Sequence, residues 1–214
     1  MSPVINTAIM AENGRTEHSA DARLLVLLHG YGSHEGDLIE LAPWLPDDLT
    51  MVALRAPIDL GEGYSWMNVQ GSPQQLIAGG IAAAEAVLEW LDVFIASWGT
   101  PVGTSLLGFS QGAAVSTELL RLAPDRFEAA VILSGMSLAG DRTGDAALAA
   151  RRPPVFWGRD LEDPVIPEAF IDQTLIWLPE HSTLTERLYT GIGHGVSSAE
   201  MADVSAFLTA ARSV

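Results

Sequence analysis

The chain has 214 residues, 48% of them apolar, enough for one domain with a full-sized core over residues 1–214. It contains no cysteine, which excludes disulfides, thiolate metal sites and a cysteine nucleophile. Its 11 basic and 27 acidic residues give a net charge of -16. This charge argues against nucleic acid and anionic membrane surfaces as partners, and it favours neutral or cationic substrates.

The first residues lack the basic start and apolar run of a signal peptide, so we expect a cytoplasmic protein. The long apolar segment at 76–98 is interrupted by Glu85, Glu89 and Asp92. It therefore predicts a buried amphipathic helix and no stable membrane association. A homodimer is compatible with the sequence, and we expect neither a metal nor another cofactor.

Strand and helix patterns alternate along the chain. In the first half of the chain we predict a weak strand at 4–11 with a turn at 12–15 that favours a hairpin, a strand at 23–28, a glycine-rich loop at 29–33, a short helix at 37–45, a strand at 51–55, an irregular segment at 58–73 and a helix at 74–98. In the second half we predict strands at 102–109, 127–133, 154–158 and 183–189. The helices between and after them are predicted at 111–122, 168–178 and 198–211, with a loop and a short helix at 138–152. This alternation predicts an α/β fold with a mostly parallel central sheet and helices on both faces.

Four loops with chemically useful residues follow predicted strands. They contain Gly30, Ser110, Asp163 and His194. Because sites in parallel sheets lie beyond the carboxyl ends of the strands, we expect these loops to converge on one edge.

Ser110 is the predicted nucleophile. It stands in Gly-Phe-Ser-Gln-Gly, between a buried strand and a helix. A sharp strand-to-helix turn of this kind lifts the serine hydroxyl above the sheet and points the N–H of Gln111 towards a developing oxyanion.

The base must be a histidine that follows the serine in the chain order Ser, acid, His. Only His181 and His194 follow Ser110. His181 lies in a polar connection, whereas His194 follows a strand and sits between two glycines, so His194 is the predicted base.

The acid must lie between the serine and the histidine, after a strand. Asp160, Glu162 and Asp163 all satisfy this condition. Asp163 directly precedes Pro-Val-Ile-Pro, which fixes the backbone at the start of a helix, and it is preferred over the other two. The alternative role for Asp163 is that of a helix cap.

The second oxyanion donor is expected from the loop after an early strand. The loop at 29–32 fits this position and makes the Tyr31 N–H the partner of the Gln111 N–H. His29 is expected to be a structural residue beneath the loop.

Five segments together resemble the phospholipase/carboxylesterase family, which includes small bacterial carboxylesterases and acyl-protein thioesterases. They are Leu-His-Gly-Tyr-Gly at 28–32, Arg-Ala-Pro at 55–57, Gly-Phe-Ser-Gln-Gly-Ala at 108–113, Asp-Pro-Val-Ile-Pro at 163–167 and Gly-His at 193–194. The resemblance runs from about residue 24 to 208. It implies an α/β-hydrolase fold without a large cap, Ser110, Asp163 and His194 as the triad, and Tyr31 and Gln111 at the oxyanion hole.

The sequence thus predicts a serine hydrolase that cleaves short- to medium-chain carboxylic esters through an acyl-enzyme intermediate. In the irregular segment, Trp66 and Met67 are predicted to line one wall of the acyl groove, with Met136 and Leu138 opposite. The alternative is that Trp66 anchors the loop to the core. The alternative functions are a thioesterase or lysophospholipase-type deacylase, and a hydrolase-fold protein that binds a small ligand without turnover.

Overall fold

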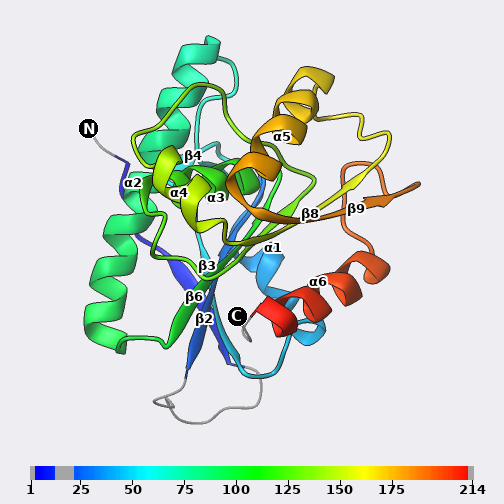
Figure 1. Ribbon diagram of the computed structural model, residues 1–214. Coiled ribbons are helices and arrows are strands. Elements are labelled where there is room, and N and C mark those ends of the chain that lie inside the picture. The colour runs from blue at the N-terminus through cyan, green and yellow to red at the C-terminus, as the bar shows by residue number, and fades with distance from the viewer. Residues whose placement is uncertain (1–2, 13–21, 212–214) are drawn as a thin grey trace.

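The computed structural model describes residues 3–12 and 22–211 and is built around a seven-stranded sheet (Figure 1). In spatial order the strands are β1 (Ala8–Glu12), β3 (Leu49–Leu54), β2 (Arg23–Leu28), β6 (Gly103–Phe109), β7 (Ala130–Leu133), β8 (Pro154–Asp160) and β9 (Thr183–Tyr189). Every neighbouring pair is parallel except β1 with β3. Between β3 and the long helix, β4 (Ile58–Asp59) and β5 (Tyr64–Ser65) form a separate antiparallel pair.

The central strands are buried on both faces, because helices cover both sides of the sheet (Figure 1). Alternate residues of β2 point to opposite faces: Leu24 and Val26 pack in one cluster, and Leu25 and Leu27 in the other. The first cluster includes residues of α2 (Pro73–Trp98), α3 (Gln111–Leu122), α4 (Asp145–Arg151) and α5 (Glu168–His181). The second includes residues of α1 (Glu35–Ile39), the 3-10 helix η1 (Ala42–Trp44) and α6 (Ser198–Ala211).

This arrangement confirms the predicted α/β fold with a mostly parallel sheet. In the described part of the chain, the connections at the carboxyl edge form no separate cap. The loops after β2, β6, β8 and β9 emerge at that edge, and the carboxyl ends of these strands therefore position the site.

The hairpin predicted near the N-terminus is wrong. The strand β1 pairs antiparallel with β3, while β2 lies between β3 and β6. The apolar β2 is buried between two parallel neighbours, whereas Ile9 and Met10 of β1 are exposed, as suits an edge strand. Most of the predicted turn, residues 13–15, lies outside the described residues.

The long helix α2 begins one residue before the predicted start at 74. Its N-cap Ser72 accepts from the Gln75 N–H, and the Gln75 side chain accepts from the Ser72 N–H. Among the described residues, no helix combines the length and apolar character required to span a bilayer.

The first turn of α6 buries a carboxylate against β8. The side chain of Glu200 is fully buried, and within the described structure neither of its oxygens has a hydrogen-bond partner. Gly158 makes room for it, because a Cβ there would lie 2.1 Å from Glu200 Oε1. Burial, and secondarily the charge of Asp203, raises the pKa of Glu200 to about 7.

The raised pKa of Glu200 predicts a pH-dependent contribution to stability. Because the folded pKa of about 7 exceeds the unfolded value of 4.5, the protonated form stabilises the fold, and this contribution is lost as pH rises from about 4.5 through 7. Relative to Glu200→Gln, the wild type should lose roughly 3 kcal/mol of unfolding free energy over this range. Urea unfolding of both proteins between pH 5 and pH 8 measures the difference; a pH-independent difference would contradict the prediction.

Candidate active site

The turn between β6 and α3 holds Ser110 in a strained conformation, with φ 54° and ψ -113°. Two glycines permit the turn. A Cβ on Gly108 would lie 2.4 Å from the Gly112 carbonyl oxygen, and one on Gly112 would lie 2.0 Å from the Leu28 carbonyl oxygen. Strand, helix and the neighbouring β2 therefore approach at backbone distance, and the serine side chain is held at the carboxyl edge.

The loop after β9 brings His194 to this serine. His194 Nε2 lies 2.8 Å from Ser110 Oγ, although the two residues are 84 positions apart in the chain. The imidazole also packs against the Phe109 ring, with centroids 5.0 Å apart. His181, the other histidine after the serine, lies at the end of α5 and contacts the Trp177 carbonyl instead.

Asp163 completes a continuous row of polar contacts. Its Oδ2 lies 2.8 Å from His194 Nδ1, and its side chain is 3% exposed against 16% for the histidine. Its Oδ1 accepts from the backbone N–H groups of Val165 and Ile166, at 2.8 and 3.2 Å. One carboxyl oxygen thus fixes the loop while the other faces the imidazole.

Asp160 does not contact His194 directly but binds the loop that carries it. Its Oδ2 accepts from the N–H groups of Ile192 and Gly193, at 2.6 and 2.7 Å, in the loop that carries His194. Hydrogen bonds from backbone N–H groups, that of Glu162 foremost, hold the pKa of the Asp160 carboxyl below its usual value. This carboxylate joins the β8 end to the histidine loop. Its contact with that loop is a feature that sequence reasoning missed.

The two predicted oxyanion donors flank the serine. The Gln111 N–H opens α3, where the first amides lack intrahelical acceptors, and Tyr31 lines the same cavity as Ser110. Within the described residues, neither of these N–H groups donates to another protein group. Tyr31 is 48% exposed.

His29 lies beneath this loop, as expected of a structural residue. Its Nδ1 contacts the Gly30 carbonyl at 2.7 Å, and its Nε2 accepts from the Ala56 N–H at 3.1 Å. Both contacts require a neutral ring with the proton on Nδ1. Burial, which lowers the pKa of His29, favours that neutral form.

The Gln111 side chain ties a third loop to the nucleophile turn. Its Oε1 accepts from the Trp66 N–H at 2.7 Å, and its Nε2 donates to the Met67 carbonyl at 2.9 Å. The Trp66 indole N–H in turn donates to the His29 carbonyl at 2.8 Å. The segment around Trp66 therefore braces both loops that carry the candidate oxyanion donors.

A cavity of about 400 Å³ lies beside the serine. Its apolar wall consists of Leu38, Leu41, Phe109, Val165 and Val196. Leu38 and Leu41 stand three positions apart on the α1–η1 segment, and Val165 and Val196 lie within three residues of the aspartate and the histidine. For Val165 and Val196, their closeness in the sequence to the predicted triad residues is the signal by which they could have been found.

The four predicted wall residues do not line this cavity. Trp66 and Met67 are 1% exposed and belong to the core, and they border a second hollow near Pro57 and Gln75. Met136 packs against the same core, and Leu138 is buried within it. The predicted position of Trp66 in the acyl groove finds no support in this geometry, which favours the core-anchor alternative.

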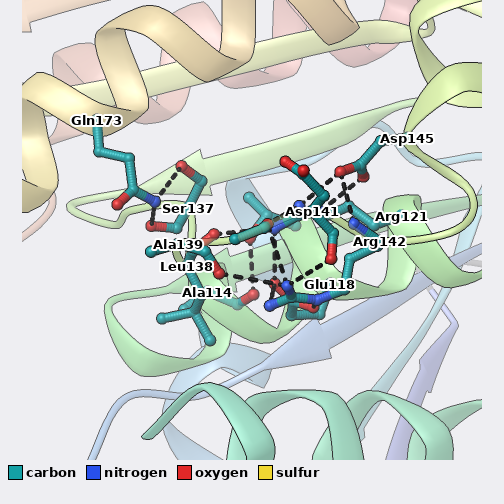
Figure 2. A network of polar contacts seen from close by, with 12 residues as sticks. Ala114, Glu118, Arg121, Ser137, Leu138, Ala139, Asp141, Arg142, Asp145 and Gln173 are labelled. Atoms are coloured by element: carbon teal, nitrogen blue, oxygen red, sulfur yellow. Dashed lines mark hydrogen bonds and ion pairs between the residues drawn. The ribbon is translucent and has the colours of Figure 1, made fainter. Parts of the chain in front are cut away.

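A buried ionic network contacts the backbone of Leu138 (Figure 2). Arg121 donates to the Leu138 carbonyl at 2.9 Å and pairs with Asp145 at 2.7 Å, and Arg142 pairs with Glu118 at 2.7 Å. The two arginines balance the two carboxylates, as buried charges require. The loop between β7 and α4 is thereby fixed.

We predict that Trp66→Ala mainly affects stability. Removing a buried indole should cost about 3–5 kcal/mol of unfolding free energy. For acetyl and octanoyl esters alike, KM should change less than about threefold, because the side chain lies outside the cavity. Trp66→Phe is the matched variant, since it keeps most of the packing and removes the bond to the His29 carbonyl. Thermal melts and steady-state kinetics check both; a KM effect that grows with acyl length in a stable variant would restore the groove-wall role.

Comparison with known proteins shows which family this chain resembles. A family model described as Phospholipase/Carboxylesterase matches residues 11–212. Acyl-protein thioesterase 1 of Candida albicans is 26% identical over 86% of this chain and 90% of its own length. A probable carboxylesterase of Oryza sativa subsp. japonica is 25% identical over 73% of this chain and 62% of its own length.

Solved structures share the fold of this chain. Esterase PE8 superimposes with a TM-score of 0.77 and 27% identity, covering 98% of this chain and 99% of that one. A carboxylesterase from Mesorhizobium loti shares the fold at a TM-score of 0.77 and 20% identity, with the same coverage. Because the family model spans nearly the whole sequence, this chain belongs to the phospholipase/carboxylesterase family of α/β hydrolases.

Proposed function

We propose that this chain is a serine carboxylesterase that cleaves short- to medium-chain esters through a Ser110–His194–Asp163 triad. The observation that carries the proposal is the unbroken row of contacts, 2.8 Å from serine to imidazole and 2.8 Å from imidazole to carboxylate. These are the distances that proton transfer and imidazole orientation require.

In the proposed reaction, Ser110 Oγ attacks the ester carbonyl while His194 Nε2 takes its proton. The imidazolium then gives that proton to the leaving alcohol oxygen, and Asp163 stabilises the cation through Nδ1–H. The N–H groups of Tyr31 and Gln111 donate to the tetrahedral oxyanion. Water repeats the sequence in place of the alcohol and releases the acid and the free serine.

The proposed acyl length follows from the cavity. A volume of about 400 Å³ lies near the lower end of small-molecule sites, and five apolar side chains form one wall. A short acyl chain can bury most of its surface there. A long chain would extend into solvent, because the described residues include no cap that would cover it.

The test is labelling with a fluorophosphonate probe, followed by kinetics on nitrophenyl esters from acetate to palmitate. We expect labelling that Ser110→Ala abolishes, and kcat/KM that peaks between acetate and octanoate. No labelling of the folded wild type would favour the alternative of a ligand-binding protein without turnover. A maximum at palmitate would contradict the proposed acyl length.

The alternative of a thioesterase has support in the similarity to an acyl-protein thioesterase. The same triad attacks thioesters, so the residues do not distinguish the two. Oxygen esters and thioesters of one acyl group, compared by kcat/KM, separate them. We expect the oxygen ester to be the better substrate.

A further inference from the structure

We propose that Asp37 makes this active site selective for esters that carry a positive charge. The inference rests on the proposed esterase function and adds the substrate class. Asp37 lies on α1, lines the same cavity as Ser110 and His194, and has no part in the proposed triad.

The carboxylate of Asp37 is held in place. The hydroxyl of Ser33, another lining residue, donates to Asp37 Oδ2. His34 Nε2 lies 3.4 Å from Oδ1, and this imidazole offsets the negative charge only when it is protonated. The side chain is 52% exposed, so it remains accessible to a ligand.

Two other carboxylates close to the cavity, Glu35 and Asp163, have side-chain partners within the protein. Glu35, two residues earlier, forms an ion pair with Arg55, whose Nε–H donates to Glu35 Oε2 at 2.8 Å. Asp163 faces His194. Among the described residues that line the cavity, Asp37 is the only carboxylate. Its partners are a hydroxyl and an imidazole, and its side chain is half exposed, so Asp37 is the carboxylate that the cavity presents to a ligand.

The surroundings of Asp37 suit a particular kind of ligand group. Leu38 and Leu41 lie beside it in the cavity wall, so a charged group with methyl or methylene carbons meets both a carboxylate and an apolar surface. An ammonium group fits this combination, and a carboxylate on the substrate is repelled. The net charge of -16 acts in the same direction by attracting cations to the protein.

The test compares esters that differ only in charge. Acetylcholine and 3,3-dimethylbutyl acetate have the same shape and differ by one positive charge on the alcohol. Esters of 4-(trimethylammonio)butyrate and 5,5-dimethylhexanoate place the same difference on the acyl part. The measured quantity is the ratio of kcat/KM for the charged ester to that for its neutral partner, in which intrinsic reactivity cancels between variants.

In Asp37→Asn we expect this ratio to fall by about two- to fivefold in at least one pair, the range for an exposed charge pair. The neutral esters should change less than about twofold. The loss should shrink when the ionic strength rises from about 0.01 M to about 1 M, because the screening length falls from about 30 to about 3 Å.

The matched control is Asp47→Asn, which removes the same unit of charge. Asp47 precedes the amino end of β3, opposite the edge that carries the site, and is exposed. Its ratios should equal those of the wild type. If Asp37→Asn does not fold, Asp37→Ser takes its place in the same design.

Three results would overturn the inference: unchanged ratios in the Asp37 variant, an equal fall in Asp47→Asn, or a loss on neutral esters that matches the loss on charged ones. Failure of the wild type to cleave any of the esters, charged or neutral, would instead overturn the proposed function. The two failures are therefore distinguishable.

Discussion

Ser110→Ala is expected to lower kcat on nitrophenyl esters by about 10⁴-fold or more, equivalent to about 5 kcal/mol of transition-state stabilisation. The hydroxyl oxygen lies 2.8 Å from His194 Nε2, and we expect it to form the covalent bond to the acyl group. Substrate binding should remain, because the cavity wall is unchanged. The residual rate should come from the oxyanion donors and from binding.

The control for this change is Ser116→Ala in the same helix. The Ser116 hydroxyl is buried and donates to the Gly112 carbonyl at 3.0 Å, within the helix. Its removal should leave kcat within about threefold, since no reacting atom contacts it. Activity of Ser110→Ala within about tenfold of the wild type would contradict its assignment as nucleophile.

Much of the fold could be predicted from the sequence because the local patterns of strands and helices agree with the tertiary structure. The helices at 111–122 and 198–211 and the strand at 183–189 lie where predicted. Apolar runs with helices between them permit few arrangements other than a parallel sheet. The positions of Ser110 and His194 followed, because loops at the carboxyl ends of such strands meet at one edge.

The cavity wall could not be predicted in the same way. Large apolar residues in an irregular segment can face either a groove or the core, and composition does not distinguish the two. The side chain of Gln111 decides the matter for Trp66, by accepting its backbone N–H at 2.7 Å and drawing the segment inward. That contact spans 45 positions, and no local pattern predicts it.

The sequence offers three carboxylates as candidates for the triad acid. Replacing the one that contacts His194 gives the second large expected effect. Asp163→Asn should lower kcat by about 10³- to 10⁴-fold. The N–H groups of Val165 and Ile166 donate to Asp163 Oδ1, so an asparagine will keep its carbonyl oxygen on that side. Its amide nitrogen then faces His194 Nδ1 as a donor. This orientation places the imidazole proton on Nε2, where it cannot accept the serine proton.

Asp160→Asn is the matched change, with one carboxylate converted to an amide three positions earlier, at the end of β8. The Asp160 carboxylate accepts from Ile192 and Gly193 and contacts no reacting atom, so kcat should fall less than about tenfold. Weakening one of these bonds should cost about 1–3 kcal/mol of unfolding free energy and lower Tm by about 2–10 °C. Glu162→Gln should likewise leave kcat within about tenfold.

Kinetics and melting temperature together distinguish a group that orients the imidazole from one that holds its loop. In Asp163→Asn, the fall in kcat should be large and the change in Tm small, because the bonds to the loop remain. In Asp160→Asn, Tm should fall clearly and kcat should change little. If Asp160→Asn lost 10³-fold in kcat and Asp163→Asn kept its activity, the acid would be Asp160, and the 2.8 Å contact between Asp163 and His194 would be a structural one.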